Sequence, residues 1–343
     1  MSEMTFGRVS DLNGLPELIL AWGGEEALRR TLDRQILPYE ILDDRDAVIP
    51  MKDIIGLYRN AAEVTGIRSF GLKATEGIEL SEYGAMADFV LSAKTLKGAI
   101  AKFKTGLPYY ESGSEISVQY SENECTIGYQ NLFQSIVGFR QAGDMTLRIL
   151  EAVIRAYLGP EWCPKSIKLA CSSGPWEQDY EDTFEAPVHF CSDSFAFVLD
   201  RDQFEEARAI QASNGDALVS LADLKHLGED LPLDFIGSVA HLIKIHLPDG
   251  KSGLEETARA LAMGPRTLQR RLEAHGIGFR DLLERVRMQR ACELLRGSEA
   301  TVAIIGNELG YSATSHFTRA FTRVFEVSPS KYRSEITASA RLM

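Results

Sequence analysis

The sequence has few cysteines and no long hydrophobic run. Near the N-terminus the longest apolar run is 18–22, and no basic segment precedes it, so we expect no signal peptide. No stretch approaches the ~20 apolar residues that a transmembrane helix needs. The five cysteines show no CxxC spacing of the kind that indicates a metal or redox site. These absences predict a cytoplasmic protein that neither enters a membrane nor depends on disulfides.

Catalytic and metal-binding motifs are also missing from residues 1–213. This part of the chain contains no serine nucleophile elbow, HExxH pair, Walker loop or dinucleotide fingerprint. His189 and Cys191 lie two apart on an expected strand, but further ligands at fixed spacing are lacking, so we expect both to pack. The carboxylates at 76, 79 and 82 predict a solvated acidic face. We therefore expect no enzyme activity, no metal and no cofactor.

Charge is divided unevenly along the chain. The 343 residues are too many for one core and suit two domains. The net charge of −12 argues at first against nucleic acid, whose phosphates attract basic proteins. From Lys251 onward, however, 15 basic and 10 acidic residues give +5, whereas residues 1–250 carry −17. The split predicts an acidic module joined to a nucleic-acid-binding domain.

The first domain, expected over residues 1–213, mixes helices and strands. Apolar spacing predicts helices over 15–35, 50–65, 86–103 and 147–158. Alternation predicts a hairpin over 116–129 and strands over 167–171 and 188–199. Phe190, Phe195 and Phe197 fit a strand facing the core, and lining a pocket is the alternative. Asn214-Gly215, Gly228 and Pro232 then place a connection over 214–232. The fold class is α+β followed by an all-α domain.

The second domain, expected over 233–333 with a tail at 334–343, begins with a helix-turn-helix pattern. A helix over 254–263 is followed by Gly264 in a turn and by Pro265, which suits the first position of the next helix. In that helix, about 265–275, Leu268 and Leu272 share one face. The opposite face carries side chains that suit base edges in a major groove, namely Arg266, Gln269 and Arg270.

The pattern occurs a second time. Thr301 is expected to cap a helix that Gly310 closes, and Ser312 to cap a second helix over about 313–325. Phe317 and Phe321 lie on its inner face. The outer face carries Thr314, Ser315, Thr318, Arg319 and Arg323.

An arginine-rich helix of ~27 Å over 279–296 joins the two units. One such unit alone is typical of an ordinary helical hairpin. Two of them on a common connector predict recognition helices that meet successive major grooves, whose spacing is ~34 Å.

Residues 233–333 resemble the DNA-binding domain of the AraC/XylS family, most specifically in LGYSATSHFTRAFTRVFEVSPSKYR at 309–333. The resemblance implies that the base-reading positions fall on Arg266, Gln269, Arg270, Thr314, Ser315, Thr318 and Arg319. Two positions depart from the family pattern. Gly306 stands where the family usually has alanine, and Glu326 stands where it usually has glycine. We expect both to affect stability more than DNA binding.

The first domain resembles the arabinose-binding-type N-terminal domain of one AraC subfamily, with F-x-A-P-V-x-F at 184–190. This resemblance implies a small-molecule effector domain that also dimerises, and it identifies neither the ligand nor its residues. The predicted function is an effector-responsive transcription regulator, an activator in the cytoplasm, that binds promoter DNA and RNA polymerase as a homodimer. Two alternatives remain open at this point: a DNA-architectural protein without effector, and a regulator with an enzymatic N-terminal domain.

Overall fold

The computed structural model describes residues 4–132, 138–205 and 219–340. The chain divides into two compact units. Residues 5–35 and 39–231 form the N-terminal domain, and the other unit, the C-terminal domain, is built chiefly from residues 232 onward. Residues 206–218, which include the expected domain end at 213 and the start of the expected connection, lie outside the described residues. In the described part of the chain, no helix is long and apolar enough to cross a bilayer.

The N-terminal domain is α+β, as expected. Its helices are α1 (Leu15–Arg34), α2 (Met51–Thr65), α3 (Phe70–Ala74), α4 (Gly84–Leu91), α5 (Leu96–Tyr110), α6 (Phe139–Leu158), α7 (Glu177–Phe184) and α8 (Leu221–Leu227). Its strands are β1 (Phe6–Arg8), β2 (Val48–Pro50), β3 (Ser114–Tyr120), β4 (Glu124–Asn131), β5 (Ser166–Lys168), β6 (Val188–His189) and β7 (Phe195–Asp200). Short 3-10 helices lie between them, among them η1 (Val9–Leu12), η3 (Leu80–Tyr83) and η5 (Gly228–Asp230).

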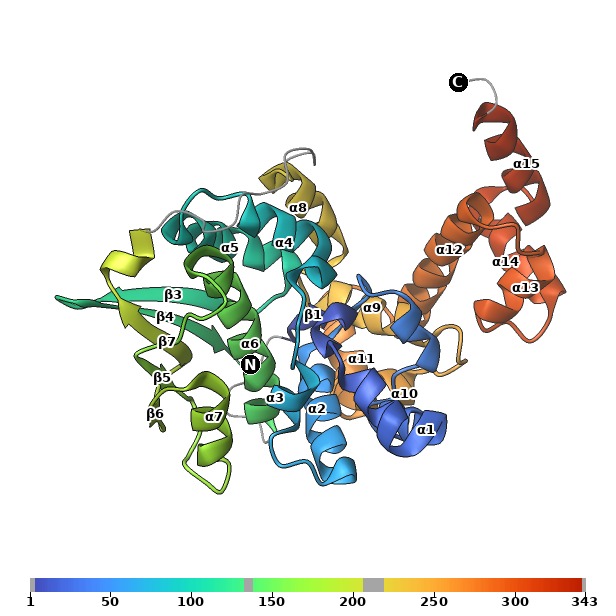
Figure 1. Ribbon diagram of the computed structural model, residues 1–343. Helices are drawn as coiled ribbons and strands as arrows, with labels where there is room; N and C mark the ends of the chain where they lie inside the picture. The colour runs from blue at the N-terminus through green and yellow to red at the C-terminus, as the bar shows by residue number, and fades with distance from the viewer. Residues whose placement is uncertain (1–3, 133–137, 206–218, 341–343) are drawn as a thin grey trace. The chain divides into compact units, whose positions relative to one another are not determined.

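Five strands form one sheet in the order β3-β4-β7-β5-β6, in which only β5 and β6 pair in parallel. The alternation read from the sequence sets the register, because Ile127 lies opposite Phe197 and Tyr129 opposite Phe195. Helix α5 packs on β3, and α6 packs on β7 (Figure 1). Phe195 and Phe197 are fully buried. They belong to the core, as expected, and do not line the cavity described below.

Several expected boundaries differ from the structure. The helix expected over 86–103 is two helices, because the Thr95 hydroxyl accepts the Gly98 N–H and starts α5 afresh. The strand expected over 188–199 is likewise two strands, β6 and β7, with Cys191 between them at a φ of 56°. His189 and Cys191 are exposed, so the expected packing role of these two residues is wrong. In the described residues, no group of three His, Cys, Asp or Glu is placed to hold a metal ion.

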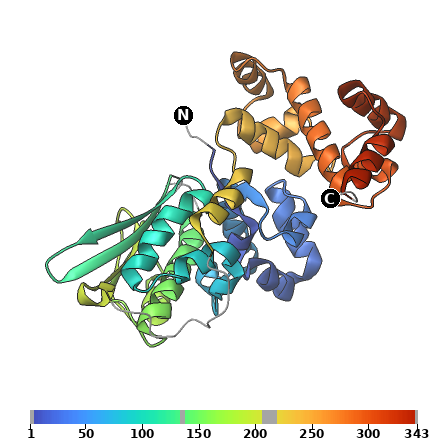
Figure 2. The ribbon, with the colours of Figure 1, turned by 90° about the horizontal axis from the view of Figure 1, so that it is seen from above.

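Helix α8 lies inside the stretch expected to connect the domains, and it belongs to the N-terminal domain. It begins with a capping box, in which Ser220 and Asp223 bond to each other's backbone N–H. Its Leu224 is fully buried, and the helix packs on α4 and α5 (Figure 2). The structure therefore differs from the expected connection over 214–232 at this helix.

The C-terminal domain is all-α, as expected. Its helices are α9 (Phe235–His246), α10 (Leu254–Ala260), α11 (Pro265–Ala274), α12 (Phe279–Gly297), α13 (Val302–Glu308), α14 (Thr314–Phe325) and α15 (Pro329–Ala340). One apolar core runs from Val239 of α9 to Phe321 of α14. Helix α12 lies between the two helix-turn-helix units, which are α10 with α11 and α13 with α14 (Figure 1).

The two turns close in the same way. In the first, Ala262 has a φ of 53°, and the N–H groups of Ala262 and Met263 donate to the carbonyls of Arg259 and Ala258. The second repeats this geometry, with Gly310 at a φ of 74°. Both are Schellman closures, which place one residue in the left-handed region. Gly264 lies between the two helices, as expected, but it has extended backbone and forms the N-cap of α11, so the left-handed position falls on Ala262.

The second helix-turn-helix unit agrees with the sequence expectations at one cap and differs at the other. Thr301 caps α13 as expected, because its hydroxyl accepts the Ile304 N–H. Ser312 does not cap α14, whose N-cap is Ala313. At Gly306 a Cβ would lie 3.2 Å from the Cβ of Phe317, so the glycine permits the close approach of α13 and α14. Glu326 ends α14 at a φ of 61°, the region that favours the glycine usual in the family.

The left-handed turn position predicts opposite effects of one methyl group in the two units. Ala262→Gly relieves the strain of a Cβ at positive φ, so we expect it to raise the free energy of unfolding by ~0.5–1 kcal/mol. The matched Gly310→Ala introduces that strain and should lower it by ~1 kcal/mol. Urea denaturation of residues 232–343 measures both. A loss of stability in Ala262→Gly would contradict the assignment of the turn.

Candidate nucleic-acid interface

Helix α11 separates an apolar face from a polar one. Leu268 and Leu272 are fully buried in the core of the C-terminal domain. Arg266, Gln269 and Arg270 are exposed. Pro265 occupies the first turn of the helix, where its missing N–H leaves no hydrogen bond unmade. The helix therefore presents two arginines and one glutamine to solvent in the order that the sequence predicted.

Helix α14 has the same division. Phe317 and Phe321 are fully buried and contact each other edge to face, with ring centroids 5.8 Å apart. On the opposite side Thr314, Ser315 and Arg319 are exposed, and Thr318 is half-buried. Small hydroxyl side chains at the N-terminal end of this helix leave its backbone accessible, whereas Arg319 extends from the next turn.

The seven expected reading side chains share one further property. In the described part of the chain, none of them makes a side-chain hydrogen bond or ion pair. Polar groups buried in a protein core are usually hydrogen-bonded to one another or to the backbone. Free arginine and glutamine side chains on an exposed helix face retain their full capacity to donate hydrogen bonds to base edges and phosphates.

The arginines of α12 differ from those of the reading helices. The Arg290 guanidinium pairs with Glu293 at 3.1 Å and with Glu308 at 3.3 Å. Arg296 donates to the Tyr332 hydroxyl at 2.8 Å, which holds α15 against α12. Arg285, by contrast, is exposed and makes no such contact within the described residues. Arg290 and Arg296 of this helix are thus engaged in contacts within the domain.

Arg287 of α12 contacts the turn between α13 and α14. Its guanidinium lies over the Tyr311 ring, 4.8 Å from the centroid, and donates to the Gly310 carbonyl at 3.3 Å. Arg323 of α14 pairs with Glu284 of α12, and Arg271 of α11 stacks on Phe235 at 3.9 Å. Sequence reasoning missed these roles, because an arginine next to a turn has no periodic signal that separates a structural contact from a DNA contact.

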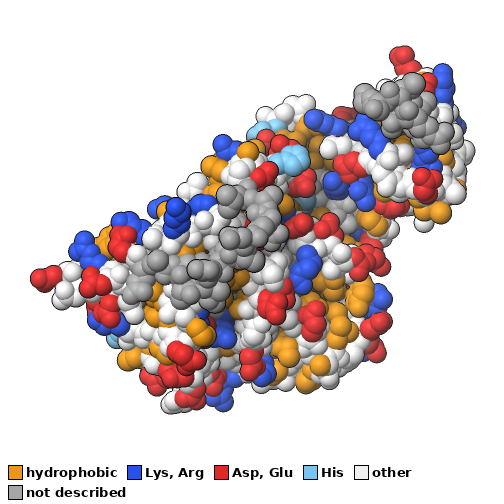
Figure 3. Space-filling view, turned by 45° about the horizontal axis from the view of Figure 1, so that its top comes forward, with side chains coloured by type: hydrophobic (Ala, Val, Ile, Leu, Met, Phe, Trp, Pro, Cys, Tyr) orange, Lys and Arg blue, Asp and Glu red, His pale blue; other side chains and the backbone are white. Residues whose placement is uncertain are grey.

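The two domains differ in surface charge. Acidic side chains are scattered over the face of the N-terminal domain seen in Figure 3, in agreement with the net charge of −17 over residues 1–250. The glutamates at 76, 79 and 82 are exposed, as expected. The C-terminal domain carries the excess of arginine, and its free arginines include Arg266, Arg270 and Arg319 on the two reading helices.

Comparisons with known proteins agree with this division. Residues 257–335 match the family described as a helix-turn-helix domain, and residues 27–207 match the arabinose-binding domain of AraC transcription regulators. The transcriptional regulator VirS of Mycobacterium tuberculosis is 24% identical, over 96% of this chain and 100% of its own length. VqsM of Pseudomonas aeruginosa is 25% identical, over 85% of this chain and 94% of its own.

Among solved structures, the transcriptional regulator CdpR of Pseudomonas aeruginosa is similar to this chain. It is 24% identical, with a TM-score of 0.41 over 90% of this chain and 96% of its own. The match over residues 27–207 covers more than half of the chain and adjoins a helix-turn-helix domain. The chain therefore belongs to the AraC family of DNA-binding transcription regulators, in the group that carries an arabinose-binding-type N-terminal domain.

Proposed function

We propose that this protein reads a specific DNA site with α11 and α14, which enter successive major grooves. The observation that carries the proposal is the free polar face of each helix, opposite a fully buried apolar face. The base-reading residues are Arg266, Gln269, Arg270, Thr314, Ser315, Thr318 and Arg319. Arginine donates twice to guanine and glutamine pairs with adenine, so these side chains suit direct readout.

We further propose that the N-terminal domain binds a small-molecule effector and dimerises, and that residues 233–333 are the DNA-binding domain. A dimer would occupy two repeats of the site and, as an activator in the cytoplasm, contact RNA polymerase at the promoter. The family membership supports an effector domain in this position. The acidic surface supports the assignment of DNA binding to the C-terminal domain, because a net charge of −17 disfavours direct DNA contact by residues 1–250.

Base readout predicts position-dependent losses. Arg270→Ala and Arg319→Ala should each weaken binding to the cognate site by ~1–3 kcal/mol and relax base preference, at different positions of the site. Arg285→Ala is the matched control, since Arg285 is exposed on α12 rather than on a reading helix. Binding of residues 232–343 to a library of site variants measures all three. Equal losses on every sequence would mean that Arg270 and Arg319 contact only phosphates.

Arg287→Ala should act through stability. The substitution removes the hydrogen bond to the Gly310 carbonyl and the stacking on Tyr311, which together contribute ~1–2 kcal/mol. We expect the free energy of unfolding to fall by that amount, while base preference stays as in the parent. A full loss of DNA binding with unchanged stability would instead place Arg287 on the DNA.

The connector fixes the spacing of the two sub-sites. Helix α12 has 19 residues, about 28 Å, and contains no proline, so the reading helices cannot change their separation. The sub-sites should lie about 10–10.5 bp apart on one face of the duplex. Inserting five base pairs moves one sub-site to the far side, and inserting ten adds ~34 Å that α12 cannot span. Both insertions should reduce binding of residues 232–343 to that of a single unit. Full affinity after the ten-pair insertion would show a flexible connector.

A further inference from the structure

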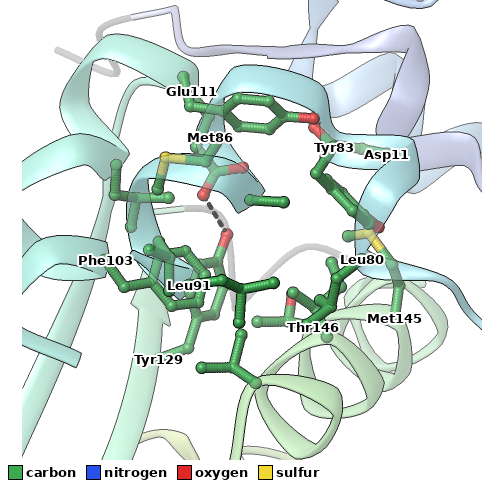
Figure 4. Close-up of a pocket in the computed structure, with 16 residues that line it drawn as sticks. Asp11, Leu80, Tyr83, Met86, Leu91, Phe103, Glu111, Tyr129, Met145 and Thr146 are labelled. Atoms are coloured by element: carbon green, nitrogen blue, oxygen red, sulfur yellow. Dashed lines mark hydrogen bonds between the residues drawn. The ribbon is translucent and has the colours of Figure 1, made fainter. Parts of the chain in front are cut away.

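A cavity of about 40 Å³ lies in the N-terminal domain between α4, α5 and α6. Its walls are mostly apolar, with Val90 from α4, Leu107 from α5 and Ile149 from α6 (Figure 4). Two methionines, Met86 and Met145, also line it. The space holds only a few water molecules as it stands. Methionine side chains are unbranched and adaptable, so their movement would enlarge the cavity without a change in the fold.

One wall of the cavity is polar. The Tyr129 hydroxyl donates to the Glu111 carboxyl at 2.9 Å, across the cavity from Met145 (Figure 4). Asp11 and Tyr110 line the same space, and Tyr110 shares a short hydrogen bond with Ser10. Burial, together with the nearby Asp11, raises the pKa of Glu111 to about 8. Burial likewise raises the pKa of Asp11 to about 6.

Arg8 faces this polar wall and is itself fully buried. Its guanidinium lies over the Tyr110 ring, 5.5 Å from the centroid, and its backbone N–H donates to Asp11 at 3.0 Å. The cluster therefore holds two carboxyl groups against one guanidinium. With both carboxyls ionised it carries one negative charge, which a buried site must neutralise by a proton or by a cation.

We propose that this cavity is the effector site and that its ligand is an apolar amine, with an alkyl or aryl body between α4, α5 and α6 and an ammonium group against Glu111. This inference rests on the proposed function, in which the N-terminal domain binds an effector. A sugar fits the cavity poorly, because the apolar walls offer no partners for its many hydroxyl groups and each unpaired hydroxyl is costly to bury. An ammonium on an apolar body matches both walls.

The same cavity is coupled to α8. The Arg8 guanidinium donates to the carbonyl of Leu227, the last residue of α8, at 2.9 Å. On the apolar side, a Cβ at Gly106 of α5 would lie 2.9 Å from Leu224 of α8 and 3.0 Å from the sulfur of Met86. A ligand that displaces Met86 therefore disturbs the packing of Leu224 against α5. Because η5 ends at Asp230 and α9 begins at Phe235, α8 leads directly into the C-terminal domain along the chain.

Isothermal titration of the full-length protein tests the ligand class. The probes are n-alkylamines of six to ten carbons, n-alkanols of the same lengths and L-arabinose. We expect the amines to bind at least tenfold more tightly than the matched alkanols, and arabinose not to bind. Glu111→Gln should remove that tenfold preference, whereas Glu115→Gln, an exposed neighbour on β3, should keep it.

Proton release gives a second readout. The titratable groups that act on Glu111 are Asp11, Tyr110 and Tyr129. Without ligand, Glu111 holds a proton at pH 7 because its pKa is about 8. An ammonium favours the carboxylate, so each amine bound should release about one proton, and affinity should rise between pH 6 and pH 8. Buffers of different ionisation enthalpy report the proton count. No proton release, or amines that bind no better than alkanols, overturns the ammonium assignment.

DNA binding of the full-length protein tests the coupling. A bound amine should change the affinity for the cognate site at least threefold in the parent. Leu224→Ala should retain amine binding within twofold and lose this response, whereas Leu20→Ala, a surface leucine on α1, should keep it. If no amine binds while DNA binding persists, the cavity proposal fails and the proposed function stands. A parent without specific DNA binding would instead refute the proposed function.

Discussion

The surface that each reading helix offers depends on the burial of two side chains on its opposite face. In α11 these are Leu268 and Leu272, and in α14 they are Phe317 and Phe321, all fully buried. Burying one such side chain contributes ~1.5–3 kcal/mol, more than a typical exposed polar contact. Turning a helix by one residue, about 100°, would expose an apolar side chain and bury a charged one. The direction in which Arg270 and Arg319 extend is therefore set by the core.

Most of the C-terminal domain was predictable from the sequence, because its helices are amphipathic and its turns contain glycine or proline. The errors arose where a backbone conformation is imposed by hydrogen bonds that composition does not reveal. Ala262 takes the left-handed position because the Schellman closure of α10 requires it there, whereas Gly264, the residue with the freedom to adopt it, has extended backbone. At Ser312 the helix begins one residue too late for the hydroxyl to cap it.

The N-terminal domain was predictable in its strands but not in its polar interior. The alternation of apolar residues in β4 indicated which of its side chains lie opposite Phe195 and Phe197 of β7. Arg8 gave no such signal. It lies among mixed residues near the N-terminus, and its burial depends on Leu227, 219 positions away along the chain. Long-range pairing of single polar residues has no periodicity, so the sequence could show neither the cluster around Glu111 nor the packing of α8.

Several arginines of the C-terminal domain are engaged in contacts within the domain. Arg287, Arg290 and Arg296 each bond to a carbonyl, a carboxylate or a hydroxyl of the domain, and they hold α12 against its neighbours. Such contacts lower the capacity of these side chains to neutralise phosphates. The arginines left free on α11 and α14 are those that the buried faces turn outward. Arg266, Arg270 and Arg319 therefore remain available to base edges, whereas Arg285, exposed on α12, is available for phosphate contacts, which add affinity without sequence preference.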